Sequence, residues 1–396
     1  MKRFFSIRNL CTLLFLLALA FFLAVGLWPF GSTALRGARM LAEGGALDTK
    51  SLESYFNDRL SEHLHPFITL NGGVERVFGK RAVNERYRLD NGKLTYVIPE
   101  LDMNKIAART VDFAHYVEER GIPFVYVNAL FYLDEDDKQL PPSIEDYGNE
   151  NADRFLALLR EAGITALDLR EREKAAGIDH YSHFFNTDHH WTPEMGFWAF
   201  TEIQAYLSGL DPSWTAEPEI SDFNSYGVEV RENCFLGSNG RRVGVWYAGK
   251  DDFSVITPNF DTALEVWSSR DGCARRGTLA DCLFYPELFD ADPYEASLYD
   301  FYCGGDEWMD IRNLAAEKGL TYCGNGKRIL LVKDSASLVV IPWLSLACGE
   351  IRTYDLRFED ERLPDLIASW QPDLVMVLYN PGALEDNNWN MFQFLR

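Results

Sequence analysis

The C-terminal part of the chain alternates short apolar runs with amphipathic segments, and this pattern constrains the fold more than any other feature. It predicts strands at 328–332, 351–354 and 374–378, with helices between them at 336–347 and 363–370. Strands that alternate with helices form right-handed crossover units around a parallel sheet. Pro342 should kink or shorten the first of these helices. The sequence therefore predicts an α/β fold with a parallel sheet flanked by helices.

The N-terminal half shows the same alternation, with helices at 104–120, 152–162 and 192–207 and strands at 124–127 and 164–169. Thr192 is a suitable N-cap for the third helix, because a proline follows at the first helical position. From about 209 to 325 the alternation stops, and short β-prone runs such as 242–247 are separated by turns. We expect this segment to be an insertion of antiparallel strands and irregular loops.

The first thirty residues contain a targeting signal. Three basic residues, Lys2, Arg3 and Arg8, precede an uncharged and mostly apolar run from Leu10 to Phe30 that is long enough to cross a bilayer. The basic flank predicts a cytoplasmic N-terminus and an extracytoplasmic remainder. The alternative is a cleaved signal peptide with small residues at 32–34 as the cleavage site. The length of the run favours an uncleaved, single-pass anchor in the cell membrane.

These features divide the chain into three parts. Residues 1–32 are the cytoplasmic N-terminus and transmembrane anchor, residues 33–95 a helical stalk or lead-in, and residues 96–396 the α/β domain with its insertion at about 209–325. Six cysteines lie beyond the anchor, and both a disulfide framework and free thiols with one bridge are open. Because no C-x-x-C spacing occurs, we do not expect a zinc ribbon.

Net charge limits the partners. The chain carries a formal charge of -22, and nucleic-acid binding requires basic patches that neutralise phosphates. We therefore exclude nucleic acid as a partner. The acidic surface is instead typical of a protein kept soluble by its charge.

The sequence Asp-His-His-Trp at 188–191 brings a carboxylate, two imidazoles and an indole together. Asp188 and His190 are two positions apart, so in an extended segment both side chains project from the same side. A carboxylate in that position can orient an imidazole that acts as a general base. In such a segment His189 would point away from the pair. The motif lacks a nucleophile, which must come from elsewhere in the chain.

Two predicted strand ends provide the missing groups. Reactive residues collect at the carboxyl ends of strands in open α/β sheets, and Ser335 follows the strand at 328–332 immediately before a helix. The backbone amides of Ser335 and Ala336 could bind a developing oxyanion there. Asn380 follows the strand at 374–378 and could donate its amide to the same oxyanion. The alternatives are that Asp334 or Ser335 only caps the helix and that Asn380 begins an ordinary turn.

Taken in order, these motifs resemble the DHHW proteins of bacteria, which are related to the alginate O-acetylation proteins of the AlgX and AlgJ type. That family carries a circularly permuted SGNH-hydrolase-like domain with a flavodoxin-like sheet. The resemblance extends from about Leu52 to Arg396. The segments that carry it are 186–192, 233–238, 242–244, 333–336 and 372–375.

The resemblance implies a catalytic triad. Ser335 would be the nucleophile, His190 the general base and Asp188 its orienting carboxylate, with Asn380 as the oxyanion asparagine. A serine hydroxyl needs an adjacent base because it is a weak nucleophile at neutral pH. Related proteins often have an aromatic residue after the serine, whereas this chain has Ala336, which alters the pocket wall. The candidate substrate contacts are His189, Trp191, Ser238 and Arg242.

The function implied is a serine-dependent O-acetyltransferase or acetylesterase that acts on cell-envelope or exported polysaccharide through an acyl-enzyme and without a cofactor. Acetyl-CoA is cytosolic, so the resemblance also implies a membrane-bound O-acyltransferase as the acetyl donor. A metal site at Asp188, His189 and His190, with His180 and His183 upstream, is not favoured because adjacent histidines cannot easily face one ion. The remaining alternative is an inactive SGNH-like protein that binds carbohydrate or assists envelope assembly.

Overall fold

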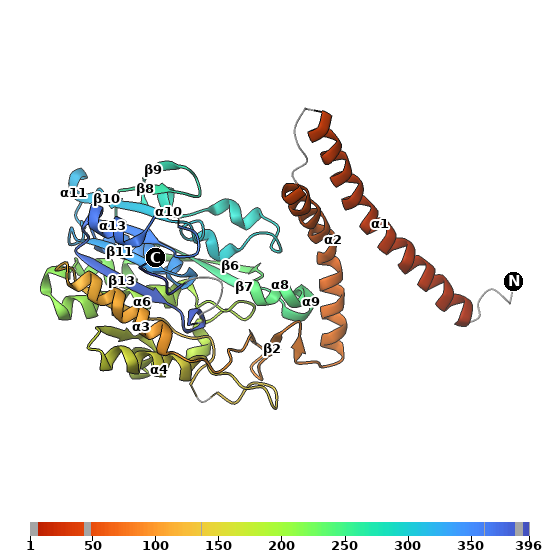
Figure 1. Ribbon diagram of the computed structural model, residues 1–396, viewed down its shortest axis with the longest axis horizontal. Coiled ribbons are helices and arrows are strands. Elements are labelled where there is room, and N and C mark those ends of the chain that lie inside the picture. Colours follow the sequence, from red (N-terminus) through yellow and green to blue (C-terminus); the bar gives the residue numbers. More distant parts are fainter. Residues whose placement is uncertain (1–6, 43–48, 136, 360, 385–390, 396) are drawn as a thin grey trace.

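The computed structural model describes residues 7–42, 49–135, 137–359, 361–384 and 391–395, so Lys2 and Arg3 lie outside the described residues. Its largest element is an eight-stranded mixed sheet in the order β5-β4-β13-β11-β12-β10-β8-β9 (Figure 1). Helices lie on both faces of this sheet. The α/β architecture predicted from the sequence is confirmed.

Five parallel strands form one side of the sheet. They are β5 (Ala166–Asp168), β4 (Phe124–Asn128), β13 (Leu374–Tyr379), β11 (Arg328–Lys333) and β12 (Glu350–Tyr354). In β4 and β13 every residue is buried, as expected for strands covered on both faces. Strand β11 lies between β12 and β13 and is parallel to both, with Lys333 opposite Leu378. The carboxyl ends of β11 and β13 therefore meet at one edge of the sheet.

Two hydrophobic clusters cover the two faces. One contains the apolar sides of α3 (Asn104–Glu118), α4 (Gly148–Glu161) and α13 (Leu363–Trp370). The other contains those of α5 (Leu169–Ala176), α6 (Pro193–Leu210) and α12 (Ile341–Ala347). The chain is thus wound on both sides of the sheet, in agreement with the expected crossover connections.

Local sequence signals explain two helix starts. Thr192 caps α6 by accepting a hydrogen bond from the Met195 amide at 3.4 Å, and Pro193 is the first helical residue. After β11 the chain forms a short 3-10 helix, η6 (Ser335–Val339), before α12 begins at Ile341 with Pro342 in its first turn. The expected shortening of a single helix at Pro342 is therefore confirmed, since proline is tolerated only in a first turn.

The segment from 209 to 325 contains antiparallel strands, as expected, but it extends the main sheet. Strands β8 (Leu264–Ser268), β9 (Cys273–Gly277) and β10 (Met309–Asn313) continue the sheet, and β10 pairs antiparallel with β12. Two further strands, β6 (Tyr226–Phe235) and β7 (Asp251–Pro258), form a separate antiparallel pair.

The prediction of β structure at 242–247 is wrong. These residues belong to two short helices, α8 (Ser238–Val243) and α9 (Val245–Ala248). They are separated by Gly244, whose φ is +86° and whose site has no room for a side chain because a Cβ would lie 2.6 Å from the Ile68 carbonyl oxygen. Contact with α2 therefore overrides the local β propensity.

The lead-in segment is helical only in its first part. Helix α2 (Thr49–Val77) contacts the domain through Thr69 Oγ1, which lies 2.6 Å from the hydroxyl of Tyr294. It is followed by a small antiparallel sheet of β1 (Ala82–Val83), β2 (Arg86–Arg88) and β3 (Leu94–Thr95). The backbone amide of Leu94 donates to the Asn186 carbonyl at 2.8 Å, so this sheet lies beside the Asp-His-His-Trp segment.

The expected membrane span at 10–30 lies within α1 (Ile7–Ala42), which projects away from the sheet domain in Figure 1. Over the residues that the structure describes, no helix combines the length and the apolar character that a membrane crossing requires.

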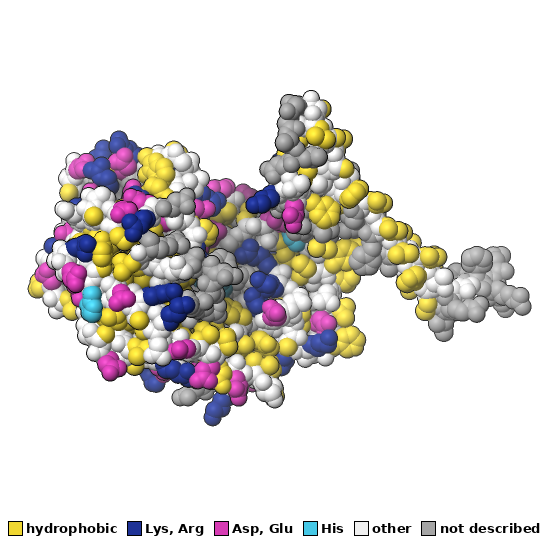
Figure 2. All heavy atoms as spheres, viewed as in Figure 1, with side chains coloured by type: hydrophobic (Ala, Val, Ile, Leu, Met, Phe, Trp, Pro, Cys, Tyr) yellow, Lys and Arg dark blue, Asp and Glu magenta, His cyan; other side chains and the backbone are white. Residues whose placement is uncertain are grey.

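On the domain surface, acidic and basic side chains are interspersed (Figure 2). All seven cysteines lie in the described part of the chain and have free thiols, so neither a disulfide framework nor a single bridge is present.

Candidate active site

The structure brings Asp188, His190 and Ser335 together. Nε2 of His190 lies 2.8 Å from Ser335 Oγ, and its Nδ1 lies 2.5 Å from Asp188 Oδ1. Ser335 is supplied by the turn after β11, whereas the other two residues come from an earlier loop, in which His190 lies 145 positions before Ser335. This is the geometry of a serine activated by a histidine that a carboxylate orients.

The local geometry of the histidine loop differs from the expectation. Phe184 and Trp191 form an isolated antiparallel bridge, and the residues between them turn rather than extend. The amide of His190 donates to Asp188 Oδ1 at 3.0 Å, which closes an Asx turn. The expectation that His189 points away is wrong, because a turn lacks the alternation of a strand. Its ring lies 3.9 Å from that of His190, between ring centres.

Electrostatics match the proposed division of roles. Burial opposes ionisation of Asp188, but His190, His189 and the Ser238 amide outweigh it, so the pKa of Asp188 falls well below its usual range. Burial is the largest influence on His190 and would lower its pKa, yet the charge and hydrogen bond of Asp188, together with the charges of Asp306 and Asp334, outweigh burial and raise the net pKa. The pKa of His189 is about 3, because burial and the positive charge of His190 disfavour its protonation. His190 is thus the basic imidazole, and His189 stays neutral.

Helix α8 and a distant aspartate hold the motif in place. The Ser238 amide donates to Asp188 Oδ2 at 2.5 Å, and this approach requires Gly237, because a Cβ there would lie 2.3 Å from that of Asp188. Asp251 accepts hydrogen bonds from the backbone amides of Asn186 and Thr187, both at 2.8 Å. Sequence reasoning missed Asp251, since nothing local distinguishes it from other strand residues.

Two predicted substrate contacts have supporting roles instead. Trp191 is only 2% exposed, and its indole N–H donates to the Ala336 carbonyl at 2.9 Å, so it packs beneath the serine turn. Ser238 is not part of the cavity wall, and its hydroxyl lies 2.9 Å from His189 Nδ1. Both assignments as substrate contacts are therefore corrected. Tyr299, which was not predicted, stacks on His190 with ring centres 4.0 Å apart.

Asp334 connects the two strand ends that carry Ser335 and Asn380. Its carboxylate accepts hydrogen bonds from the backbone amide of Ala336 at 2.9 Å and from the backbone amide of Asn380 at 2.7 Å. Burial, which outweighs these hydrogen bonds, raises the pKa of Asp334 to about 6. The predicted use of the Ala336 amide as an oxyanion donor is therefore wrong for this arrangement, because Asp334 already occupies it.

Two oxyanion donors remain. The Ser335 amide, at the first position of η6, has no acceptor among the described residues. The side-chain amide of Asn380 donates to the Leu130 carbonyl at 2.6 Å, and its second N–H is not used by the described residues. Both Ser335 and Asn380 line the same cavity. The site therefore offers one backbone and one side-chain donor near the nucleophile.

A compensated group of buried charges lies behind the serine. Lys333 is fully buried, and its Nζ lies 3.0 Å from an Asp306 carboxylate oxygen and 3.6 Å from one of Asp355. Arg357 pairs with the same two carboxylates, at 2.8 Å for Asp306 and 2.6 Å for Asp355. The two cations share the same two carboxylates, so the charges balance, which offsets the free-energy cost of burying them.

The cavity over Ser335 has a volume of about 720 Å³. Of the residues predicted from the sequence, those that line it are Ser335, Ala336, His189, His190, Arg242 and Asn380. Sequence reasoning missed several others in the wall, among them Arg86, Tyr96 and Arg357. Arg86 and Tyr96 come from the lead-in segment, and no motif marks them.

The metal alternative has one geometric point in its favour. Ligand atoms of Asp188, His189 and His190 all lie within 4.8 Å of one another, so the adjacent histidines do face a common point. An ion there would compete with the hydrogen bond between His190 and Asp188. His180 lies elsewhere, with Nδ1 3.0 Å from a Glu173 carboxylate oxygen. The arrangement suits a hydrogen-bonded triad better than a metal centre.

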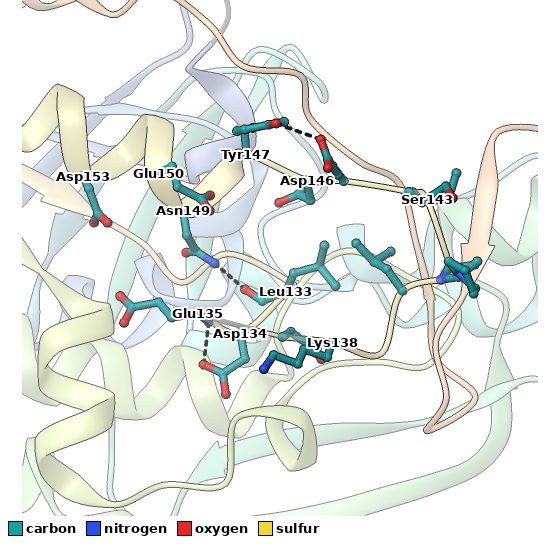
Figure 3. A pocket seen from close by; sticks show the side chains of 16 residues that line it. Leu133, Asp134, Glu135, Lys138, Ser143, Asp146, Tyr147, Asn149, Glu150 and Asp153 are labelled. Carbon is teal, nitrogen blue, oxygen red and sulfur yellow. Dashed lines mark hydrogen bonds between the residues drawn. The ribbon is translucent and has the colours of Figure 1, made fainter.

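A second cavity of about 570 Å³ is lined by residues of the loop that precedes α4 and of the first turns of α4 (Figure 3). Its wall carries many carboxylates, among them Asp134, Glu135, Asp146 and Glu150, with Lys138 as the basic member. Its described lining contains no histidine or cysteine.

The serine at the carboxyl end of β11, with a base and a carboxylate from a neighbouring loop, agrees with the triad that the resemblance to SGNH-hydrolase-like proteins implies. Residues 108–219 match the family described as "SGNH hydrolase-like domain, acetyltransferase AlgX". The matched part contains Asp188 and His190 and ends before Ser335. The sequence resemblance to AlgX-type SGNH-like proteins is thereby confirmed.

Solved structures share the fold. PatB1 from Bacillus cereus is 19% identical with a TM-score of 0.64, and the comparison covers 78% of this chain and 99% of PatB1. A DHHW family protein from Eubacterium siraeum is 17% identical with a TM-score of 0.58, over 79% of this chain and 96% of that protein. No curated protein sequence matches the chain.

Proposed function

We propose that the protein is a serine-dependent O-acetyltransferase or acetylesterase that acts on cell-envelope or exported polysaccharide through an acyl-enzyme. The observation that carries the proposal is the position of His190, which bridges Ser335 Oγ at 2.8 Å and Asp188 Oδ1 at 2.5 Å. The match of residues 108–219 to an acetyltransferase family supports the choice of acetyl as the acyl group. An inactive carbohydrate-binding protein would not need this alignment.

In the first half-reaction, Nε2 of His190 takes the proton from Ser335 Oγ as the oxygen attacks the acetyl carbonyl carbon. The tetrahedral oxyanion accepts hydrogen bonds from the Ser335 amide and the free N–H of Asn380. Asp188 stabilises the imidazolium that forms. His190 then returns the proton to the leaving oxygen, and the acetyl group stays on Ser335 as an ester.

In the second half-reaction, His190 takes a proton from the acceptor, and the acceptor oxygen attacks the acetyl ester. A sugar hydroxyl as acceptor gives transfer, whereas water gives hydrolysis. Collapse of the second tetrahedral intermediate returns the proton to Ser335 Oγ. The same residues serve both outcomes, so the occupant of the cavity over Ser335 decides between them.

The first test uses a covalent probe. PatB1 from Bacillus cereus has been solved with a sulfonyl adduct, and sulfonyl fluorides modify serines that a base activates. An aryl sulfonyl fluoride should label the wild-type protein once, at Ser335, by peptide mass mapping. Ser335→Ala and His190→Ala should both abolish labelling, whereas Ser182→Ala, at an exposed serine outside the site, should not.

The second test measures turnover with p-nitrophenyl acetate, with and without a glycan acceptor. Serine-dependent release of p-nitrophenol supports the acyl-enzyme, and acetylation of the glycan distinguishes transfer from hydrolysis. The proposal fails if Ser335→Ala and His190→Ala keep the wild-type rate of acetyl release.

The proposed setting follows from the N-terminal sequence and from the chemistry. We place the domain outside the cytoplasm, because basic residues precede the apolar run at 10–30. A membrane-bound O-acyltransferase would then supply acetyl groups. Fractionation of cells that express the full chain, followed by protease accessibility, tests this location independently of the catalytic proposal.

A further inference from the structure

Two arginines from different parts of the chain meet at the cavity over Ser335. Arg86 begins β2 and Arg242 lies near the end of α8, and both line this cavity. A two-residue turn at Asn84 and Glu85, whose φ values are +49° and +59°, returns the chain from β1 to Arg86. The Asn84 side chain donates to the Arg242 carbonyl at 2.8 Å, which ties the turn to α8. The pairing of the two arginines is thus built into the fold.

Neither arginine forms an ion pair with a described residue. Arg86 donates from Nη1 to the Glu85 carbonyl at 2.9 Å, but its Nε is buried and has no hydrogen-bond partner. Arg242 is exposed and makes no ion pair with any described residue. Arg357, the third arginine of the wall, differs because two carboxylates pair with it. Among the described residues of the cavity wall, Arg86 and Arg242 are therefore the arginines without an ion pair.

Their proximity has an electrostatic cost. The pKa of Arg86 is lowered, first because the group is partly buried and second because of the positive charge of Arg242. Glu85 also lines the cavity, but its opposing effect on the pKa of Arg86 is weaker than that of Arg242. The chain has a net charge of -22, yet among the described residues these two guanidinium groups have no carboxylate in an ion pair with them. A third, negatively charged group would relieve the repulsion.

A purely structural role explains only part of the arrangement. Arg86 lies over the Tyr96 ring, with the guanidinium carbon 5.5 Å from the ring centre, and this contact needs one arginine. Arg242 makes no such contact with a described aromatic residue, yet it lines the same cavity. The contact with Tyr96 therefore does not account for the second cation.

We propose that Arg86 and Arg242 form an anion-binding subsite beside Ser335 that recognises a carboxylate or phosphate group on the acyl acceptor. This inference rests on the proposed acetyl transfer and specifies its acceptor. Guanidinium groups bind both kinds of anion through paired, charge-assisted hydrogen bonds. An acceptor held at this point keeps its hydroxyl groups within the cavity that contains Ser335 and His190.

The test compares three acceptors in acetyl transfer from p-nitrophenyl acetate: methyl glucoside, methyl glucuronide and methyl glucoside 6-phosphate. The wild-type protein should acetylate at least one charged acceptor with a kcat/KM roughly tenfold or more above that for the neutral sugar. The better charged acceptor identifies the anion as carboxylate or phosphate. The preference should weaken as ionic strength rises.

Charge-neutralising variants connect this preference to the two residues. Arg86→Gln and Arg242→Gln should each reduce the ratio of kcat/KM for charged over neutral acceptor by roughly tenfold, mainly through KM. The matched controls are Arg88→Gln in β2 and Arg241→Gln in α8, which remove the same charge from the same elements outside the cavity wall. The controls should keep the wild-type ratio.

The outcomes separate this inference from the proposed function. Equal use of charged and neutral acceptors by the wild type, or an unchanged ratio in both Gln variants, overturns the anion subsite and leaves acetyl transfer intact. If no acceptor is acetylated, calorimetric binding of methyl glucuronide and methyl glucoside 6-phosphate to Ser335→Ala decides. If Ser335→Ala binds one of these ligands and the double variant Ser335→Ala/Arg86→Gln does not, the anion subsite stands although the transfer reaction does not. If neither ligand binds to Ser335→Ala, the subsite is overturned.

Discussion

At each end of the strand pair β11 and β13, an aspartate carboxylate accepts backbone hydrogen bonds that link the two strands, but the two aspartates differ in their surroundings. At the amino-terminal edge, the exposed Asp373 accepts a hydrogen bond from the Arg328 amide at 2.9 Å. At the carboxyl edge, the buried Asp334 accepts from the amides of Ala336 and Asn380. Both aspartates link the two strands. Only the buried one also fixes the turn that carries Ser335, the proposed nucleophile, so the two aspartates differ in burial and in their distance from the candidate site.

The difference extends to the surroundings. At the carboxyl edge, burial raises the pKa of Asp334 to about 6, and Lys333 and Arg357 are held by the carboxylates of Asp306 and Asp355. Charges in such a place interact strongly, because little water screens them. At the amino-terminal edge, solvent weakens the same kinds of interaction. Substitutions at the two edges should therefore differ more in their effect on activity than on stability.

The largest expected effect is the loss of the nucleophile. Ser335→Ala should lower kcat/KM for p-nitrophenyl acetate by on the order of 10⁴, because no acyl-enzyme can form. The hydroxyl makes no contact that the fold depends on, so the thermal midpoint should stay within a few degrees of wild type. Steady-state kinetics and calorimetry measure both. A large fall in the thermal midpoint would instead show that Ser335 stabilises the fold.

The orienting carboxylate should have the next largest effect. Asp188→Asn should lower kcat by roughly 10² to 10⁴, since the imidazolium loses its partner.

The pH profile provides a separate check on this residue. The raised pKa of His190 means that wild-type activity should fall as the pH drops through a midpoint above the ordinary histidine value of about 6.5. Loss of the Asp188 charge removes the main cause of that rise. In Asp188→Asn the acid limb of kcat/KM should therefore move to lower pH. An acid limb that does not move would contradict the assignment of His190 as the base.

The two aspartates allow a direct test of the comparison. Asp334→Ala leaves the Ala336 and Asn380 amides without acceptors, so kcat should fall roughly tenfold to a hundredfold as the oxyanion donors lose their position. Asp334→Asn keeps one acceptor and should recover part of the rate. Asp373→Ala, at the opposite edge, should leave kcat unchanged and cost about 1 kcal/mol or less of unfolding free energy. Equal losses of kcat in Asp334→Ala and Asp373→Ala would contradict the proposed difference between the two edges of the sheet.

The smallest effect is expected at Trp191. Trp191→Phe keeps most of the buried ring but loses the hydrogen bond from Nε1 to the Ala336 carbonyl. A bond of this kind contributes about 1 kcal/mol, so unfolding free energy should fall by about that amount. The rate should fall only a few-fold, as the serine turn loosens. Urea denaturation and kcat measured on the same preparations provide the comparison, and a total loss of activity would make Trp191 a direct participant.

The sequence was most informative where local pattern and tertiary structure agree. The apolar runs of β11, β12 and β13 predict buried parallel strands, and the position of Ser335 at a strand end follows from them. Prediction failed where a distant contact overrides local preference. Residues 242–247 are helical because Gly244 packs against α2, and His189 faces the cavity because an Asx turn replaces an extended segment.

Other parts of the site had no local signal. Asp251 holds the backbone of Thr187 from a strand more than sixty positions away, and Arg86 reaches the cavity from a small sheet in the lead-in segment. Neither residue lies in a recognisable motif. Only the pairing of distant segments reveals them, and a single sequence does not encode that pairing in any short pattern.

The order of the strands has a consequence for how the chain acquires its site during synthesis. Strand β13 is the last to be made and lies between β4 and β11. The earlier pair of β4 and β5 therefore has no strand to join it to β11 until residue 379 has emerged. Asp188 and His190 are made long before Ser335 and Asn380. A chain interrupted before β13 therefore has its base and its nucleophile on halves that the sheet has not yet joined. Under the proposed function, Ser335 should become reactive only when folding is nearly finished, so labelling of Ser335 should report complete assembly.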